Sequence, residues 1–189
     1  MARIRTFIAI DPGKAIHDRL IALQETLART GAQVKWVEPN NLHLTLLFLG
    51  EVDEREIPPV CQAVADVAAK QTAFAMTVES AGSFPNPRRP RVLWVGVSTG
   101  AQEVCALHDA LEPPLLDLGC YRREDRKYTP HITLGRIRTD PGTDQLAPDL
   151  AKHAGWKGGD TTVREVQVMS SKLSPDGPEY TVLSRAKLE

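Results

Sequence analysis

Two motifs of histidine and threonine are the residues of this chain whose types and spacing best suit chemistry. His-Leu-Thr-Leu occupies residues 43–46, and His-Ile-Thr-Leu occupies residues 131–134. Each motif lies in a run that alternates as a β-strand does and is followed by a glycine, so its histidine and threonine should share one face while the aliphatic residues point into apolar packing. We expect His43, Thr45, His131 and Thr133 to line one shared space.

These side chains suit acid–base chemistry on a phosphate without a metal ion. An imidazole has an unperturbed pKa of about 6.5, so a neutral histidine can activate water while a protonated one donates to the leaving oxygen. Threonine hydroxyls can hold the non-bridging phosphate oxygens. A single such motif is more often structural or on the surface, but its recurrence in matched strand contexts favours a catalytic role. From the residues alone, the acid and base roles of His43 and His131 are interchangeable.

Five longer segments, together spanning nearly the whole chain, carry a family resemblance. They are RTFIAID (residues 5–11), VKWVEPNNLHLTLLFLGEV (34–52), FPNPRRPRVLWVGV (84–97), YTPHITLGRIR (128–138) and SSKLSPDGPEYTVL (170–183). On these segments the chain resembles the two-histidine (2H) phosphoesterases, and specifically the RNA 2′,3′-cyclic phosphodiesterases of the LigT/ThpR type, or 2′-5′ RNA ligase family.

The resemblance implies an enzyme that hydrolyses 2′,3′-cyclic phosphodiester termini of RNA to 2′-phosphomonoesters, with 2′–5′ RNA ligation as a possible further activity. It implies that His43 donates a proton to the leaving 3′ oxygen, that His131 activates water, and that Thr45 and Thr133 steady the phosphoryl oxygens. The implied partners are RNA ends or nucleoside 2′,3′-cyclic phosphates. The alternative is a non-catalytic module that binds nucleotides or RNA ends, which the two intact histidines disfavour.

Three further residues are candidates for contact with the substrate. Strict alternation turns Arg136 away from His131, but a bulge at Gly135 would change this, and the resemblance implies an arginine beside the phosphate at this position. The alternative for Arg136 is a plain surface residue. Phe48 and Tyr128 could pack against a base or nucleoside, although core packing is the favoured interpretation of Phe48. The remaining histidines are interpreted as surface residues without a matching partner: His17, His108 and His153.

Periodicity along the chain predicts an α+β fold. Strands are expected at residues 4–10, 33–37, 42–49, 73–81, 91–97, 131–138, 162–170 and 179–188, and helices at 12–29, 57–67, 104–111 and 145–153. Asp11 is expected to cap the first helix with Pro12 at its first position, and Pro113 and Pro114 are expected to end the third. With the resemblance, this order favours two pseudo-twofold lobes with antiparallel sheets lining a central cleft and helices packed outside, in a single bilobal 2H phosphoesterase domain over residues 1–189.

The composition is that of an ordinary globular protein and limits the classes of partner. The chain has 189 residues, 42% of them hydrophobic and 25% charged, and a formal net charge of −1. Such a charge excludes bulk electrostatic coating of long nucleic acid. Two local basic clusters could attract a short anionic substrate, the alternative being solvated loops: Arg88, Arg89 and Arg91, and Arg122, Arg123, Arg126 and Lys127.

Neither a cofactor nor a metal ion is expected. The acidic residues are dispersed, and neither motif has the spacing of a metal-ligand set. Three scattered cysteines, Cys61, Cys105 and Cys120, favour a reduced, cytoplasmic setting. No apolar run approaches the roughly 18 residues of a membrane span, and a monomer is the default expectation.

Overall fold

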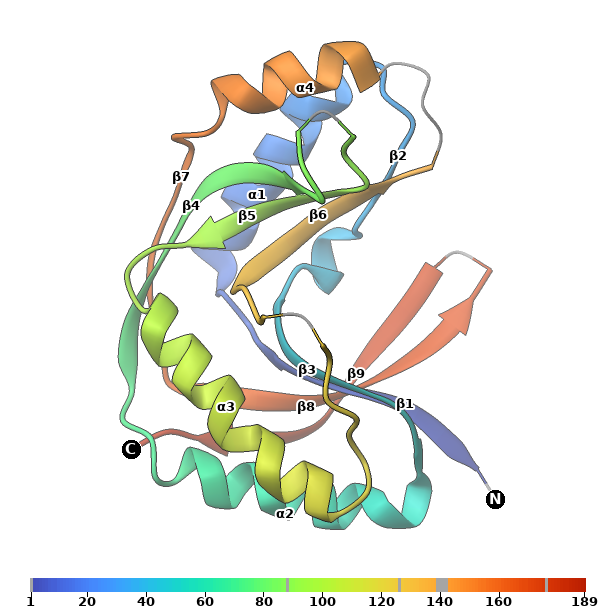
Figure 1. Ribbon diagram of the computed structural model, residues 1–189, viewed down its shortest axis with the longest axis vertical. Coiled ribbons are helices and arrows are strands. Elements are labelled where there is room, and N and C mark those ends of the chain that lie inside the picture. The colour runs from blue at the N-terminus through green and yellow to red at the C-terminus, as the bar shows by residue number, and fades with distance from the viewer. Residues whose placement is uncertain (1, 88, 126, 139–142, 176) are drawn as a thin grey trace.

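The structure is a computed structural model that describes residues 2–87, 89–125, 127–138, 143–175 and 177–189. These residues form an α+β fold in which helices pack outside an antiparallel sheet (Figure 1). The strands are β1 (Arg3–Ile10), β2 (Val34–Trp36), β3 (Leu44–Asp53), β4 (Phe74–Phe84), β5 (Val92–Val97), β6 (His131–Ile137), β7 (Lys157–Val163), β8 (Glu165–Ser174) and β9 (Gly177–Lys187). The helices are α1 (Lys14–Ala28), α2 (Ile57–Ala68), α3 (Ala101–Asp117) and α4 (Thr143–Lys152), with short 3-10 turns η1 (Pro39–Asn41) and η2 (Glu54–Glu56).

The strand order divides the sheet into two lobes that meet at the motif strands. The order is β7-β4-β5-β6-β3-β1-β8-β9, with β2 beside β6, so the two motif strands β6 and β3 lie in the middle. Among the described residues these two strands pair at one position, Leu44 with Ile132. The two parts of the sheet diverge from this junction (Figure 1). The expected α+β fold with two antiparallel lobes is confirmed.

The lobes do not coincide with the two halves of the sequence, because helices and strands cross from one lobe to the other. Helix α1 packs against β7 and α4 in the lobe that contains β6, whereas α2 and α3 pack together against β3, β8 and β9 (Figure 1). The last two strands of the chain therefore complete the lobe that the first strand begins. Each lobe therefore contains elements from both halves of the sequence, and the two motif strands belong to one continuous fold.

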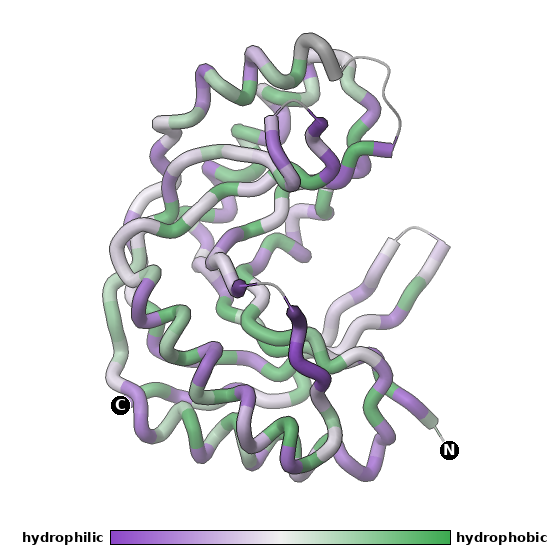
Figure 2. The backbone as a smooth tube through the Cα atoms, viewed as in Figure 1, coloured by the Kyte–Doolittle hydropathy of each residue, from purple (hydrophilic) through white to green (hydrophobic). Residues whose placement is uncertain are grey.

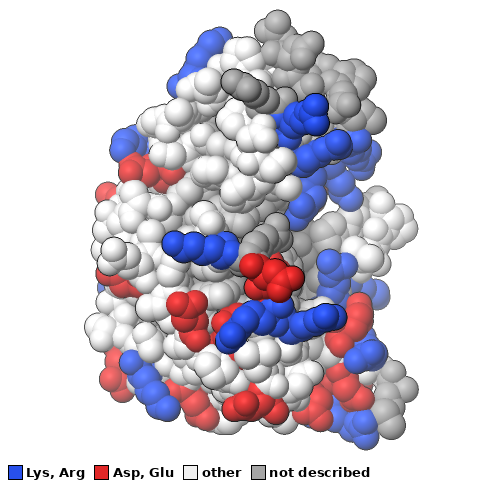
Figure 3. Space-filling model, in the orientation of Figure 1, with Lys and Arg blue, Asp and Glu red and all other residues white. Residues whose placement is uncertain are grey.

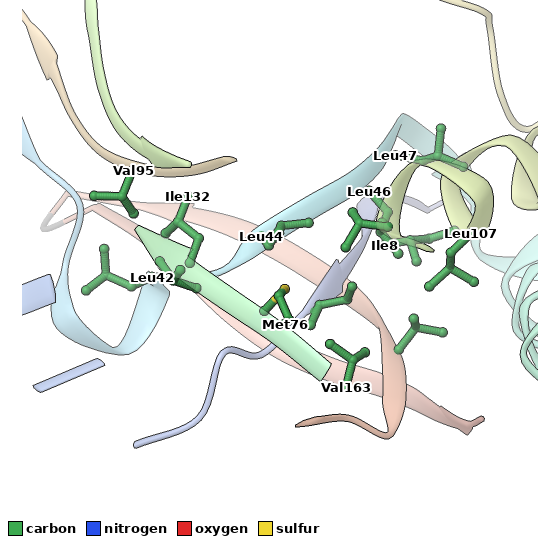
Figure 4. Packing of buried hydrophobic residues seen from close by; sticks show 14 of the residues in the cluster. Ile8, Leu42, Leu44, Leu46, Leu47, Met76, Val95, Leu107, Ile132 and Val163 are labelled. Carbon is green, nitrogen blue, oxygen red and sulfur yellow. The ribbon is translucent and has the colours of Figure 1, made fainter. Parts of the chain in front are cut away.

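Aliphatic side chains fill the space between the sheet and the helices. Leu44 and Ile132 are both 0% exposed, and Figure 4 shows them in one packed group with Leu42 and Val95. Hydrophobic and hydrophilic residues alternate along the helices (Figure 2), as expected for helices with one buried face. The backbone that carries both motifs therefore packs against an apolar core.

The first helix begins later than the sequence predicts. Gly13, rather than Asp11, is its N-cap, with a φ of 85° that glycine adopts without steric cost. Asp11 Oδ1 instead accepts a hydrogen bond of 2.8 Å from Gly13 N, which forms a turn ahead of the helix. The predicted cap at Asp11 with Pro12 in the first helical turn is therefore wrong.

The third helix continues through the two prolines that were expected to end it. α3 runs to Asp117 and contains Pro113 and Pro114. Each proline lacks an amide N–H, but Leu111 and Leu115 on either side are fully buried, and their packing stabilises the helix beyond the prolines. The predicted stop at this pair is wrong because tertiary packing outweighs the local preference.

One segment that was predicted as a single strand belongs to two different strands. The segment expected as a single strand over residues 162–170 contains the end of β7 and most of β8, which are separated at Arg164. β7 begins at Lys157 in a stretch with two glycines, which has little intrinsic strand preference. A Cβ at Gly158 would lie 2.8 Å from Val78 O, so the close approach of β7 to β4 requires a glycine here.

Candidate active site

The pairing of Leu44 with Ile132 brings the two motifs side by side. Both residues face the core, so the neighbours of each along the strand face the opposite side of the sheet. Those neighbours are His43 and Thr45 in one motif, and His131 and Thr133 in the other, and all four are partly exposed. Because the pair is antiparallel, Thr45 lies toward His131 and His43 toward Thr133.

Each imidazole is held by the backbone carbonyl two residues before it. His43 Nδ1 lies 2.6 Å from Asn41 O, and His131 Nδ1 lies 2.7 Å from Thr129 O. A carbonyl oxygen only accepts, so Nδ1 carries the proton in both rings and proton exchange with a substrate falls to Nε2. His43 Nε2 lies 2.9 Å from Thr45 Oγ1, within the same motif.

Aromatic rings surround His43 and limit its contact with water. The ring centroids of Phe7 and Tyr180 lie 4.9 Å and 5.4 Å from that of His43. Burial lowers the pKa of His43, and the hydrogen bond to Asn41 O and the negative charge of Asp11 partly oppose this effect. The imidazole of His43 therefore holds its proton less firmly than a histidine in water.

His131 has an aromatic neighbour from its own lobe. The ring of Phe84, at the end of β4, meets His131 edge-on, with centroids 5.1 Å apart. Neither residue type nor spacing pointed to Phe84, Phe7 or Tyr180. Each belongs to a segment that carries the family resemblance, but only the pairing of the strands shows that their rings contact the two imidazoles.

A set of hydrogen bonds fixes the segment that leads into the first motif. Asn41 is buried and donates from Nδ2 to Pro178 O at 2.7 Å, which joins η1 to the start of β9. His17 on α1 contacts both Asp11 Oδ1 at 3.0 Å and Pro39 O at 3.3 Å, and the bond to Asp11 raises the pKa of His17. The interpretation of His17 as a surface residue without a partner is therefore wrong.

A β-bulge brings Arg136 to the same face as His131 and Thr133. On β5, Trp94 pairs with Thr133 and Val92 pairs with Arg136, and the register shifts between these positions so that β6 holds one extra residue. Trp94 and Val92 are two apart and share a face, so Thr133 and Arg136 also share one. The bulge lies beside Gly135, the residue at which the sequence allowed for one.

A second bulge occurs at the corresponding place on β3 and turns Phe48 to the face of His43 and Thr45. On β1, Ala9 pairs with Thr45 and Phe7 pairs with Phe48, again with a register shift between them. The Phe48 side chain is 51% exposed, and its ring centroid lies 5.9 Å from that of Phe7. The favoured interpretation of Phe48 as a core residue is therefore wrong.

Tyr128 is not exposed as a platform for a base. Its ring stacks on His108 with centroids 4.1 Å apart, and its hydroxyl donates to Thr45 O at 2.8 Å. Burial raises the pKa of Tyr128. His108 is itself buried, contrary to its interpretation as a surface residue. This pair holds the segment before His131 against the first motif strand.

Positive charge borders the space between the lobes. Figure 3 shows Lys and Arg side chains along the hollow that separates the lobes on the right of the view. Arg5 pairs with Ser171, which pairs with Tyr180, so the three share a face of the β3 lobe. Burial raises the pKa of Tyr180, and the charges of Arg5 and Arg136 oppose the shift, so both cations act near this ring.

The two basic clusters lie at the surface where they are described. Arg89, Arg91, Arg122, Arg123 and Lys127 are exposed, whereas Arg88 and Arg126 lie outside the described residues. Arg123 Nε is 3.2 Å from Glu112 Oε2, so one cation of the second cluster forms an ion pair.

A groove of about 700 Å³ lies elsewhere, between α2 and α3, and is lined by residues such as Gln62, Val67 and Pro114. It contains no residue of either motif.

The His-x-Thr motif occurs twice in the chain, and the model of one protein family also matches the chain twice. Residues 10–94 and residues 95–180 each match the family described as LigT like Phosphoesterase. The chain belongs to this family. It is 36% identical over 179 residues to the RNA 2′,3′-cyclic phosphodiesterase of Methanothermobacter thermautotrophicus, covering 95% of this chain and 96% of that protein.

Solved structures of LigT-like phosphoesterases extend this similarity to the fold. A crystal structure of a Thermus thermophilus protein has a TM-score of 0.82 and 29% identity, with 98% of each chain covered. E. coli LigT in complex with 3′-AMP has a TM-score of 0.77 and 27% identity, also with 98% of each chain covered.

In the described part of the chain, no helix combines the length and apolar character that crossing a membrane requires.

Proposed function

We propose that this protein hydrolyses 2′,3′-cyclic phosphodiesters at RNA termini and releases 2′-phosphomonoesters. The observation that carries the proposal is the pairing of Leu44 with Ile132, which sets two histidines and two threonines on one face between the lobes. The relative from Methanothermobacter thermautotrophicus bears the name of this activity and aligns over nearly the whole chain. RNA ends and nucleoside 2′,3′-cyclic phosphates are the proposed substrates, and residues 1–189 act as one bilobal domain.

In the proposed reaction, water attacks phosphorus in line with the 3′ oxygen. His131 Nε2 takes a proton from the water as the new P–O bond forms, and His43 Nε2 donates a proton to O3′ as the P–O3′ bond breaks. The 2′ oxygen keeps the phosphate. His131 leaves the reaction protonated and His43 neutral, and exchange with solvent restores both.

Neutral and cationic donors steady the phosphoryl oxygens in this scheme. Thr45 and Thr133 donate through their hydroxyls, and the guanidinium of Arg136, which the bulge turns to the same face, balances the negative charge. Ligation of 2′–5′ RNA is the same displacement at phosphorus with an RNA hydroxyl in place of water: the hydroxyl oxygen forms the new P–O bond as the P–O3′ bond breaks, and O3′ takes the proton.

The test is incubation of the full chain with adenosine 2′,3′-cyclic phosphate in the presence of EDTA, with phosphorus NMR as the readout. Turnover to a 2′-phosphate that survives chelation supports the proposal, because imidazoles perform both proton transfers. Loss of turnover in EDTA that a divalent ion restores would contradict the metal-independent mechanism. Stoichiometric binding without turnover would favour the non-catalytic binding module instead.

A further inference from the structure

The two motif strands form one ladder pair with each other in the part of the chain that the structure describes. β3 and β6 pair at Leu44 and Ile132, and their ladder continues no further there. A single pair fixes the distance between two strands at one point but leaves the angle between them unset. A second direct contact between the two motif segments therefore has a large effect on how the two motif histidines face each other.

Tyr128 makes such a contact from the segment that leads into the second motif. Its hydroxyl donates to Thr45 O at 2.8 Å, and Thr45 Oγ1 lies 2.9 Å from His43 Nε2. The next residue, Thr129, holds the other imidazole, since its carbonyl oxygen lies 2.7 Å from His131 Nδ1. One phenol therefore joins the backbone of the first motif to the segment that orients the histidine of the second.

The ring of Tyr128 is itself held in place. It stacks on His108 of α3, with centroids 4.1 Å apart and an angle of 10° between the planes. His108 is 9% exposed, and its Nδ1 lies 2.9 Å from Asp109 Oδ1, so the imidazole has little freedom to turn. Burial raises the pKa of Tyr128, so its hydroxyl stays protonated and remains a donor near neutral pH. The contact with Thr45 is therefore well ordered and present wherever the histidines titrate.

We propose that Tyr128 is a positioning residue, and that its hydrogen bond to Thr45 O sets the orientation of the two motif imidazoles toward each other. The proposal rests on the proposed function and deepens it. Tyr128 acts through Thr45 and Thr129, because its own hydroxyl and ring are engaged by Thr45 and His108. A displacement of about 1 Å at the reacting groups can lower a rate by about 10²-fold. Loss of this contact should therefore reduce kcat and have little effect on KM.

The first test removes the hydroxyl and keeps the ring. The wild type, Tyr128→Phe and Tyr121→Phe are assayed with adenosine 2′,3′-cyclic phosphate over a range of concentrations. Tyr121 is the matched control, because it lies in the same segment between α3 and β6, is 9% exposed, and donates its hydroxyl to Glu112 Oε1 at 3.0 Å. We expect Tyr128→Phe to lower kcat about 10- to 100-fold and to change KM by no more than about threefold. Tyr121→Phe should match the wild type.

The division between kcat and KM separates positioning from other roles. A rise in KM at unchanged kcat would mean that Tyr128 binds substrate, and it would overturn the proposal. Full activity of Tyr128→Phe would overturn it too. The same holds for equal losses in Tyr128→Phe and Tyr121→Phe, because the loss of any buried phenol in this segment would then have the same effect. Urea unfolding checks that each variant is folded under the conditions of the assay.

The second test weakens the stack behind the ring. His108→Ala removes the stacked partner, whereas His108→Phe keeps an aromatic ring at this position. We expect His108→Ala to lower kcat roughly 2- to 10-fold, the scale of one aromatic pair, and His108→Phe to lower it less. The combined Tyr128→Phe and His108→Ala variant should lose less than the product of the two losses, because both changes act on one contact. Fully multiplicative losses would contradict the proposal.

The third test reads the position of His131 without a substrate. At about pH 8, above the ordinary histidine pKa of about 6.5, the imidazole is neutral, and ¹⁵N NMR shows which ring nitrogen carries the proton. The wild type and Tyr121→Phe should show the proton of His131 on Nδ1, facing Thr129 O, whereas Tyr128→Phe should show both tautomers. His131→Ala identifies the signal.

An unchanged tautomer of His131 in Tyr128→Phe would overturn the proposal. If the wild type turns over no cyclic phosphate at all, the proposed function fails instead, and the NMR measurement still decides whether Tyr128 orients His131.

Discussion

Leu44 and Ile132 pair across β3 and β6 and are both 0% exposed, although each stands between a histidine and a threonine that face the other side of the sheet. The proposed catalytic face and the core thus share one pair of backbone segments at the junction of the lobes. Any shift of this pair moves His43 relative to His131. The geometry of the site therefore depends on two aliphatic residues that cannot contact a substrate.

The first prediction concerns this core pair. Ile132→Ala should lower the free energy of unfolding by about 2–5 kcal/mol, and Ile132→Val by about 0.5–1.5 kcal/mol, because methyl and methylene groups are lost from a fully packed site. Urea unfolding measures both. Activity of Ile132→Ala under conditions where the protein remains folded should still fall, since the two imidazoles lose their fixed separation. A folded Ile132→Ala with full activity would show that the pair does not set the site.

The second prediction concerns the imidazoles themselves. His43→Ala and His131→Ala should each lower kcat by about 10²- to 10⁴-fold, the usual scale for a general acid or base. The double variant should lose far less than the product of the two, because both groups act in one step. His153→Ala is the matched control, since that imidazole contacts Asp149 O on α4 rather than either motif. Near-full activity of folded His43→Ala would refute paired-histidine catalysis.

The third prediction concerns pH. One histidine must be protonated and the other neutral, so kcat/KM should be bell-shaped, with limbs that belong to the pair. His43 donates only when protonated, and burial lowers its pKa, so the alkaline limb should fall below the ordinary value of about 6.5. Activity is then lost as the pH rises through the pKa of His43 in the free enzyme.

The ring of Tyr180 provides a direct check of that cause. Tyr180→Ala would admit water to the Tyr180 side of His43, weaken the effect of burial and move the alkaline limb to higher pH. Tyr180→Phe keeps the ring and should leave the limb in place. Rates measured across a pH range of roughly 4 to 9 at limiting substrate decide between the two, since this range brackets the ordinary histidine pKa. An unmoved limb in Tyr180→Ala would show that burial by this ring does not set the pKa.

The fourth prediction concerns Asn41, which holds His43 through its carbonyl and Pro178 through its side chain. Asn41→Ala leaves the carbonyl of Pro178 without its donor, at a cost of about 1–3 kcal/mol in stability. Misplacement of His43 should lower kcat by up to about 10²-fold with a smaller change in KM, because the residue positions the acid and does not bind substrate. An unchanged kcat in a folded variant would contradict this role.

The face that carries both motifs was predictable from the sequence because it rests on strand alternation and on residue type. His43, Thr45, His131 and Thr133 share the expected face since they flank buried aliphatic residues. What lies beyond each threonine was not predictable in the same way. A bulge inserts one residue and reverses the alternation, so Arg136 and Phe48 reach the cleft face against the strict pattern.

The wrong predictions for the third helix and for His17 also have a physical cause, because long-range packing overrides the local preference of a segment. Pro113 and Pro114 lie within α3 because Leu111 and Leu115 are buried on either side. His17 contacts Asp11 and Pro39 because α1, the turn before it and η1 meet in space. No local pattern in the sequence encodes such contacts between segments.

The last prediction concerns the product of the reaction and the linear 3′–5′ phosphodiester bond, which should not be cleaved. A ribose held with O3′ toward His43 and water entering beside His131 can open the ring in one direction, so the product should be a 2′-phosphate. Linear 3′–5′ RNA should remain uncut, because a cyclic five-membered ester is strained and a linear diester is not. Chromatography of the products against authentic 2′- and 3′-nucleotides, with a linear dinucleotide as the control substrate, gives the answer. A dominant 3′-phosphate would reverse the assignment of His43 as donor to O3′ while leaving a two-histidine site, since the same pair of groups can open either P–O bond according to how the sugar is bound.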